Sequence, residues 1–135
     1  MIEDRIQRSF DDQGFMQLLG AELREAADGI CVVELVGRAD LKQQHGFVHA
    51  GAVGAIADTA AGYAALSQWP DDAGVLTAEY KVSLVAPATA PVIRARAEVV
   101  RSGRTLTVCE SRVSNVLDDG AESLCAIALV TLVRR

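Results

Sequence analysis

The strongest candidate for chemistry in this chain is a single carboxylate within a long apolar stretch. Asp58 is the only residue with a formal charge between Gly46 and Pro70, and its near neighbours are Ala, Gly, Val, Ile and Thr. A carboxylate is costly to bury among such residues, so its presence there usually has a reason. Away from water a carboxylate becomes more basic, and it can activate water or attack an electrophile itself. The alternative is that Asp58 forms a salt bridge with a strand residue or points to solvent.

The stretch that carries Asp58 is predicted to be a helix beginning near His49. Alanine, the best helix former, dominates it, and Pro70 is predicted to mark its end. Its glycines each cost about 1 kcal/mol of helix stability relative to Ala, so we expect close approach of another element or a substrate to require them. Gly51 and Asp58 are seven residues apart. They therefore lie on nearly the same face of the helix, roughly 10 Å apart along its axis.

The predicted helix start is a second candidate for chemistry. The N–H groups of Ala50 and Gly51 fall in the first turn, where they have no partner within the helix and the dipole is positive. They predict a site that binds a carbonyl oxygen or oxyanion. Asp58 of the same chain is too far away to act on a carbonyl held there. Two helices packed antiparallel about a two-fold axis would bring each Asp58 to the other helix start, so we expect a homodimer with two identical sites.

The rest of the chain is predicted to form short helices and strands around this helix. Residues 2–10 predict a short amphipathic helix, and residues 15–19 a further helical turn. The last four strands are expected to follow one another in three hairpin-like steps. The element order predicts a single α+β domain over residues 1–135, with an antiparallel β-sheet wrapped around one long central helix. Strands are expected at 21–26, 30–36, 75–85, 92–101, 105–116 and 123–133.

Composition argues against several classes of protein. The net charge is −5, so a basic surface that binds nucleic acid is not expected. The charged N-terminus is unlike a signal peptide, and the run 48–66 carries Asp58 and His49, which makes it a poor membrane span. We therefore expect a soluble, cytoplasmic protein with no membrane partner. The cysteines fit small buried hydrophobes, and their spacing predicts neither a disulfide framework nor a zinc site. They are Cys31, Cys109 and Cys125.

One motif resembles that of a known family. His49-Ala50-Gly51, with Asp58 nine residues after the histidine, is similar to the His-Gly-Gly…Asp signature of hotdog-fold acyl-CoA thioesterases, most of all the phenylacetic-acid-degradation type. The similarity continues through Val75–Ala88, Arg101–Val108 and the closing apolar strand. It implies a hotdog domain that hydrolyses an acyl-CoA to a free acid and coenzyme A, with no cofactor and no metal. The family's Asp has been assigned as nucleophile or as general base, and both roles stay open for Asp58.

The resemblance also implies roles for residues near the helix start. The backbone N–H groups of Gly51 and Ala50 would polarise the thioester carbonyl, and the methyl group of Ala50, where the family has glycine, would restrict approach of the acyl chain. His49 would orient the thioester; the structural alternative is a helix-entry histidine bonded to the backbone. Gln43 stands where relatives often have an Asn that holds the nucleophilic water or the carbonyl, with Gln44 beside it.

Three further residues are implied with simple structural alternatives. Thr77 falls where some relatives have a Ser that positions the attacking water, although a strand Thr is ordinarily only a β-former. Arg101 and Arg104 flank a turn and would contact the phosphates of coenzyme A, although arginines at a hairpin tip are commonly solvated. The apolar faces of the late strands predict further pairing of dimers into a homotetramer.

Two other functions compete with thioester hydrolysis. A hotdog hydratase or dehydratase would use an Asp/His or Glu/His pair at other spacings, and no such pair can be placed here. A non-catalytic acyl-CoA binding or sensing protein would use the same pocket without turnover. Asp58 argues against the sensor, because binding alone has little need for a buried carboxylate. The favoured function is therefore acyl-CoA hydrolysis, with the identity of the acyl group left open.

Overall fold

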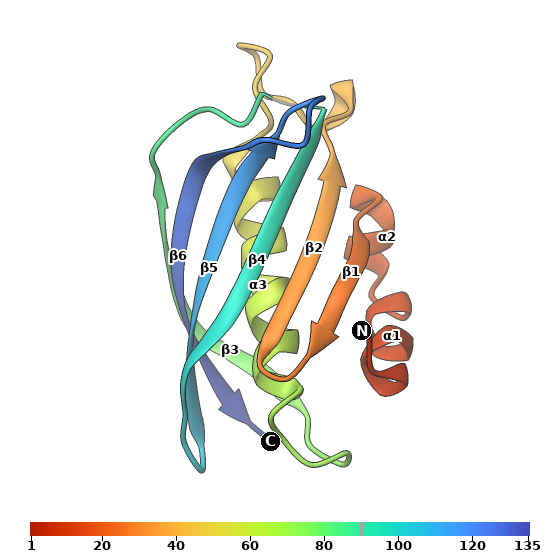
Figure 1. The fold of residues 1–135 in the computed structure, drawn as a ribbon, viewed down its shortest axis with the longest axis vertical. Helices are drawn as coiled ribbons and strands as arrows, with labels where there is room; N and C mark the ends of the chain where they lie inside the picture. Colours follow the sequence, from red (N-terminus) through yellow and green to blue (C-terminus); the bar gives the residue numbers. More distant parts are fainter. Residues whose placement is uncertain (90) are drawn as a thin grey trace.

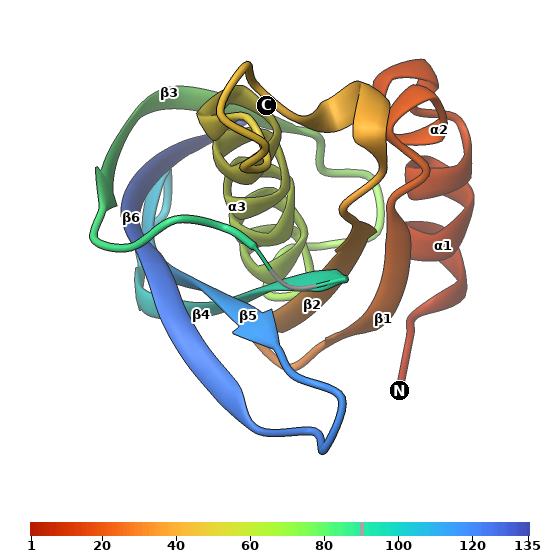
Figure 2. The ribbon, with the colours of Figure 1, turned by 90° about the horizontal axis from the view of Figure 1, so that it is seen from above.

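A six-stranded antiparallel sheet curves around one long helix in the computed structural model, which describes residues 1–89 and 91–135 (Figure 1). The long helix is α3 (Ala50–Leu66), and two short helices, α1 (Asp4–Asp11) and α2 (Gly14–Leu19), lie beside the edge strand β1 (Figure 2). This architecture confirms the predicted α+β fold with a sheet wrapped around a central helix. The strands are β1 (Glu22–Ala27), β2 (Ile30–Val36), β3 (Val75–Leu84), β4 (Val92–Ser102), β5 (Leu106–Val116) and β6 (Glu122–Arg134).

The strand order, β1-β2-β4-β5-β6-β3, corrects one prediction about the topology. β3 and β4 do not form a hairpin, because β3 pairs with β6 at the far edge of the sheet. The connection between β3 and β4 contains Pro87 and Pro91, which have no N–H to donate to a ladder. Asn115 of β5 holds this connection, donating to the Pro87 carbonyl at 3.0 Å and accepting from the Thr89 N–H at 2.8 Å.

Helix α3 ends earlier than the position of Pro70 predicted. Its last residue is Leu66, and the hydroxyl of Ser67 donates back to the Ala64 carbonyl at 2.7 Å. The guanidinium of Arg5, from α1, donates to the carbonyls of Leu66 and Trp69 at 3.0 and 2.9 Å. These contacts satisfy carbonyls that a longer helix would have bonded, so capping rather than proline ends α3. No helix in the described part of the chain is long and apolar enough to cross a membrane.

Small side chains let the sheet approach α3 closely. Ala57, Ala60, Ala61 and Ala64 are fully buried against the inner face of the sheet. The three cysteines are also buried, as predicted. A methyl group added at Gly54 or Gly62 would meet its nearest neighbour at 3.7 or 3.8 Å, an ordinary contact. Within one chain, therefore, no other element approaches Gly54 or Gly62 closely enough to require glycine, and at Gly51 the close neighbour is the ring of His49. Close approach by a substrate or a second subunit stays a prediction.

A β-bulge in β3 decides which of its side chains face α3. The pairing with β6 shifts register between Thr77 and Glu79, so Ala78 is an extra residue in the strand. Strict alternation back from Glu79 would turn Thr77 to the outer face of the sheet. The bulge reverses this, and Thr77 shares the inner face with Tyr80 and Val82, whose side chains lie over α3.

Candidate active site

Asp58 receives a hydrogen bond from the strand beside it. The Thr77 hydroxyl donates to Asp58 Oδ1 at 2.7 Å, which links β3 to the middle of α3. Asp58 is half-buried, and this burial raises the pKa of its carboxyl above the ordinary value, while the Thr77 hydrogen bond lowers it. The net shift is upward, so Asp58 is a stronger base than a solvated aspartate.

A small polar cavity of about 220 Å³ lies next to Asp58. Tyr63 contributes a hydroxyl that accepts from Gln13 Nε2 at 2.7 Å and lies 3.0 Å from Ser9 Oγ. The other lining residues are Thr59, Gly62, Val75 and Thr77, and none of the residues that line the cavity is basic. No positive charge therefore offsets the desolvation of Asp58. Sequence reasoning missed Ser9, Gln13 and Tyr63, because nothing in the pattern of residues 2–10 indicates that α1 packs beside Asp58.

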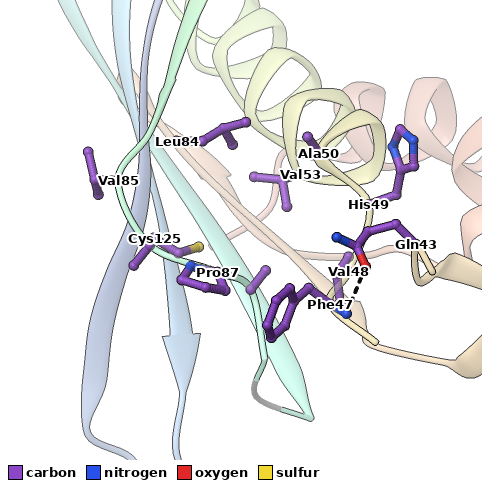
Figure 3. A pocket seen from close by; sticks show the side chains of 12 residues that line it. Gln43, Phe47, Val48, His49, Ala50, Val53, Leu84, Val85, Pro87 and Cys125 are labelled. Atoms are coloured by element: carbon purple, nitrogen blue, oxygen red, sulfur yellow. Dashed lines mark hydrogen bonds between the residues drawn. The ribbon is translucent and has the colours of Figure 1, made fainter. Parts of the chain in front are cut away.

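A second, larger cavity of about 470 Å³ opens at the start of α3 (Figure 3). Its wall is mainly apolar, and the polar groups that reach it come from Gln43, His49 and the helix start at Ala50. An apolar cavity with a few polar groups at one end is typical of a small-molecule site. The apolar wall is formed by Phe47, Val48, Val53, Leu84, Val85, Ala86, Pro87, Ala88 and Cys125.

The first turn of α3 has one N–H group without a partner among the described residues. His49 is the N-cap, and its Nδ1 accepts from the Gly51 N–H at 2.7 Å. The N–H groups of Ala52 and Val53 both donate to the His49 carbonyl, at 3.0 and 3.2 Å. The Ala50 N–H is left, at the edge of the large cavity. The structure thus differs from the sequence-based expectation for Gly51, whose N–H is already used by the cap.

Gln43 presents one particular end of its side chain to the same cavity. Its Oε1 accepts from the backbone N–H groups of His45 at 2.5 Å and Phe47 at 3.4 Å. The amide nitrogen is then the end that faces the cavity, as Figure 3 shows. A side chain held this way donates a hydrogen bond to a ligand and does not accept one. Of the two roles open for Gln43, holding the carbonyl fits this orientation. Gln44 is exposed and lines neither cavity.

The two predicted arginines lie at the opposite end of the molecule from Ala50. Arg101 and Arg104 are exposed at the β4–β5 hairpin, and neither has an ion-pair partner among the described residues. The hairpin end contacts the end of β6, where the Arg134 N–H donates to the Thr105 carbonyl at 3.0 Å. Arg134 in turn pairs with Val75 at the start of β3. These arginines therefore share the Asp58 end of the sheet.

Comparison with known proteins assigns the family. The model of the thioesterase superfamily matches residues 45–119, a segment that includes α3 with Asp58, β3, β4 and β5. The Halobacterium salinarum protein named "Putative esterase" is 35% identical over 118 residues, which cover 84% of this chain and 78% of that protein. The chain therefore belongs to the thioesterase superfamily.

Solved structures agree with this assignment. A thioesterase family protein from Silicibacter pomeroyi superposes with a TM-score of 0.92 at 39% identity, covering 96% of this chain and 95% of that chain. The E. coli PaaI protein from the phenylacetic acid degradation operon superposes with a TM-score of 0.85 at 19% identity, covering 100% of this chain and 96% of the other. At that identity the second likeness establishes the fold alone. The predicted hotdog fold is thus confirmed.

Proposed function

We propose that this protein is an acyl-CoA thioesterase whose active site combines Asp58 of one subunit with the α3 start of another. The observation that carries the proposal is that the same fold holds a half-buried carboxylate without a basic neighbour in its cavity and two hydrogen-bond donors, the Ala50 N–H and the Gln43 amide, at a helix start. Hydrolysis of a thioester needs these two things: a base or nucleophile, and donors for the oxyanion. Membership of the thioesterase superfamily supports the same reaction.

The two halves of this machinery lie apart within one chain. Ala50 and Asp58 are eight residues apart on α3, about 12 Å along its axis. Each lines a different cavity, and the two cavities have no lining residue in common. A single thioester carbon cannot contact both, so the complete site needs a second subunit.

β3 provides the surface that would bring two subunits together. In the described chain it lies at the end of the sheet order, with β6 on one side and no strand on the other. Leu76, Tyr80 and Leu84 are each at least half exposed on it. A long, exposed apolar edge strand favours pairing with another strand, and two copies of β3 related by a two-fold axis satisfy both edges.

Antiparallel pairing of two β3 strands also joins the two kinds of cavity. Thr77 and Leu84 lie near opposite ends of β3, Thr77 beside the Asp58 cavity and Leu84 in the wall of the large cavity. A two-fold axis at Tyr80 or Lys81 places Thr77 within one residue of Leu84 of the partner subunit. The Asp58 cavity of each subunit then adjoins the large cavity of the other, which supports a shared site.

The chemistry follows from this arrangement. The Ala50 N–H and the Gln43 amide hold the carbonyl oxygen, and Asp58 of the partner subunit acts on the carbonyl carbon. As general base, Asp58 takes a proton from water whose oxygen attacks; the C–S bond then breaks and the thiolate takes up the proton. As nucleophile, its carboxylate oxygen displaces the thiolate to form an anhydride, which water hydrolyses. Single turnover in oxygen-labelled water tests the second route, because label in Asp58 arises only when water attacks the Asp58 carbonyl carbon of an anhydride.

Coenzyme A is the proposed carrier of the acyl group. Arg101 and Arg104, exposed at the end of the sheet that holds Asp58, support recognition of its phosphates. The apolar wall of the large cavity supports an apolar acyl group or pantetheine arm beside Ala50. Assignment to the phenylacetic-acid-degradation group rests on the His49-to-Asp58 motif. Assembly into a tetramer and a cytoplasmic location stay predictions.

The test is release of free thiol from a panel of aromatic and aliphatic acyl-CoAs. Asp58→Asn keeps an oxygen for Thr77 to bond, so it should fold normally and lose activity by a factor on the order of 100 or more. Asp72→Asn, which neutralises an exposed carboxylate outside both cavities, is the matched control. Tight binding of acyl-CoA without turnover by the wild type would identify a sensor, and an active Asp58→Asn would make Asp58 structural.

A further inference from the structure

Gly62 lies about one turn after Asp58 on α3, and packing within the chain gives no reason for a glycine there. A methyl group at residue 62 would meet its nearest neighbour, Leu132 Cδ2, at 3.8 Å, which is an ordinary contact. Alanine would also make a more stable helix than glycine. Gly62 does, however, line the polar cavity of about 220 Å³ beside Asp58, and a side chain there would reduce that space. The space that Gly62 leaves therefore belongs to the cavity.

The two N-terminal helices supply part of the wall of the same cavity. Gln13, the N-cap of α2, donates from Nε2 to the Tyr63 hydroxyl at 2.7 Å. Ser9 Oγ, from α1, lies 3.0 Å from the same hydroxyl. Tyr63 is 3% exposed, and its ring packs against that of Phe10 with 6.0 Å between the ring centroids. Both short helices therefore hold the phenol of Tyr63 at the cavity.

This arrangement leaves one hydroxyl hydrogen over. Gln13 supplies the hydrogen of its own bond to Tyr63. The contact between Ser9 and Tyr63 uses the hydrogen of one hydroxyl, so the hydrogen of the other has no acceptor among the described residues. Thr59 adds a further hydroxyl to the lining. The cavity therefore offers hydroxyl donors together with the carboxylate of Asp58 as acceptor.

This lining suits a small neutral polar molecule, and water is the one that hydrolysis consumes. None of the lining residues is basic, so the cavity is not suited to a phosphate or a carboxylate. A water takes up about 30 Å³ in the liquid and makes about three hydrogen bonds when buried. A cavity of about 220 Å³ has room for several. Both routes open to Asp58 need one water, whose oxygen adds to a carbonyl carbon and which gives up a proton.

We propose that Tyr63, held by α1 and α2, positions water beside Asp58, and that Gly62 keeps the cavity open for this water. The N-terminal helices then complete the active site, and Tyr63 is a positioning residue that acts through the water. The proposal rests on the proposed function for its effect on hydrolysis. The large cavity is mainly apolar and offers water few partners, so the polar cavity is the store from which the attacking water comes.

Gly62→Ala tests the cavity, with Gly54→Ala as the matched control. Gly54 lies about two turns earlier on α3, lines neither cavity, and has room for a methyl group 3.7 Å from the Tyr80 ring. Both variants should raise the melting temperature by about 3 °C, because alanine is the better helix former. Only Gly62→Ala should lose kcat, on the order of ten-fold, with KM little changed. A role in packing alone would not give a protein that is more stable and slower.

The choice of acyl group separates bound water from bound substrate. If the cavity holds water, Gly62→Ala should lose the same factor in kcat with aromatic and aliphatic acyl-CoAs. A loss that depends on the acyl group would mean that the cavity binds this group, and would overturn the proposal. Tyr63→Phe keeps the ring contact with Phe10 and should also lower kcat on the order of ten-fold, without a change in acyl preference. Wild-type kcat in either variant would count equally against it.

A high-resolution crystal structure supplies a readout that does not depend on hydrolysis. In the wild type we expect an ordered water within hydrogen-bond distance of an Asp58 carboxylate oxygen and of the Tyr63 or Ser9 hydroxyl, and in Tyr63→Phe we expect this water to be lost. A wild-type cavity without it would overturn the proposal even for an active enzyme. The same water in a protein that hydrolyses no acyl-CoA would uphold the water site and reject the proposed function.

Discussion

The hydroxyl of Thr77 donates to Asp58 Oδ1 at 2.7 Å from a strand residue that a β-bulge has turned toward the helix. Both residues also line the small polar cavity. The bond stabilises the ionised form, and so opposes the effect of burial on the pKa of Asp58.

This bond predicts a change in the pH profile when the hydroxyl is removed. Thr77→Val keeps the shape of the side chain but donates nothing, so the pKa of Asp58 should rise further and the acid limb of kcat should move to higher pH. Thr77→Ser keeps the donor and is the control. The measurement is kcat against pH for the three proteins. An acid limb that stays in place in Thr77→Val would show that the hydroxyl has no influence on the pKa of Asp58.

The orientation of Gln43 predicts that replacing its amide weakens stabilisation of the transition state but leaves the fold intact. Gln43→Glu keeps an oxygen for the His45 and Phe47 N–H groups, but replaces the donor that faces the cavity with a second oxygen. We expect kcat/KM to fall on the order of 100-fold or more, the usual effect of removing one oxyanion donor. Gln68→Glu adds the same charge at an exposed position outside both cavities and should leave kcat/KM unchanged. Wild-type activity in Gln43→Glu would remove Gln43 from the site.

The hydrogen bonds of Arg5 predict that its replacement lowers the free energy of unfolding without affecting hydrolysis. Its guanidinium donates to the carbonyls of Leu66, Trp69 and Pro70, at 2.9 to 3.0 Å, at the end of α3. Arg5→Met keeps the apolar stem and leaves these carbonyls without their charged donor, so we expect a loss of about 2 kcal/mol in the free energy of unfolding. Arg8→Met, at an exposed position on the same helix, is the control. Denaturant unfolding measures both, and equal stability of the two variants would contradict the capping role.

Much of the fold could be predicted from the sequence because its patterns are local. Alanine content placed α3, alternation placed the strands, and Asp58 was distinguished by its apolar surroundings. The partner of β3 could not be predicted, because the choice between β4 and β6 depends on how the connection crosses the end of the sheet. Alternation likewise gave no sign of the extra residue at Ala78, which decides the face on which Thr77 lies.

Sequence reasoning named the candidate residues individually but not the hydrogen bonds among them. The motif named His49 and Gly51 separately, whereas the structure shows that the ring of one bonds the backbone of the other. That contact depends on a rotamer and on the missing Cβ at residue 51, neither of which residue spacing encodes. The polar cavity at Tyr63 depends on the packing of α1 against α3, a tertiary contact with no local signature.

Complementation between two inactive variants tests the shared site most directly. Asp58→Asn removes the carboxylate, and Gly51→Val places a Cβ within 2.9 Å of His49 Nδ1 and so disrupts the other half of the site at the helix start. In a mixed dimer one site carries both defects and the other carries neither, because each site takes Asp58 from one subunit and the helix start from the other. Up to about half of wild-type activity per mixed dimer should therefore return.

The measurement is thiol release after subunit exchange. Differently tagged chains report the exchange itself, and each variant mixed with itself is the control. Confirmed exchange without recovered activity would overturn the proposal that one site combines Asp58 of one subunit with the helix start of the other.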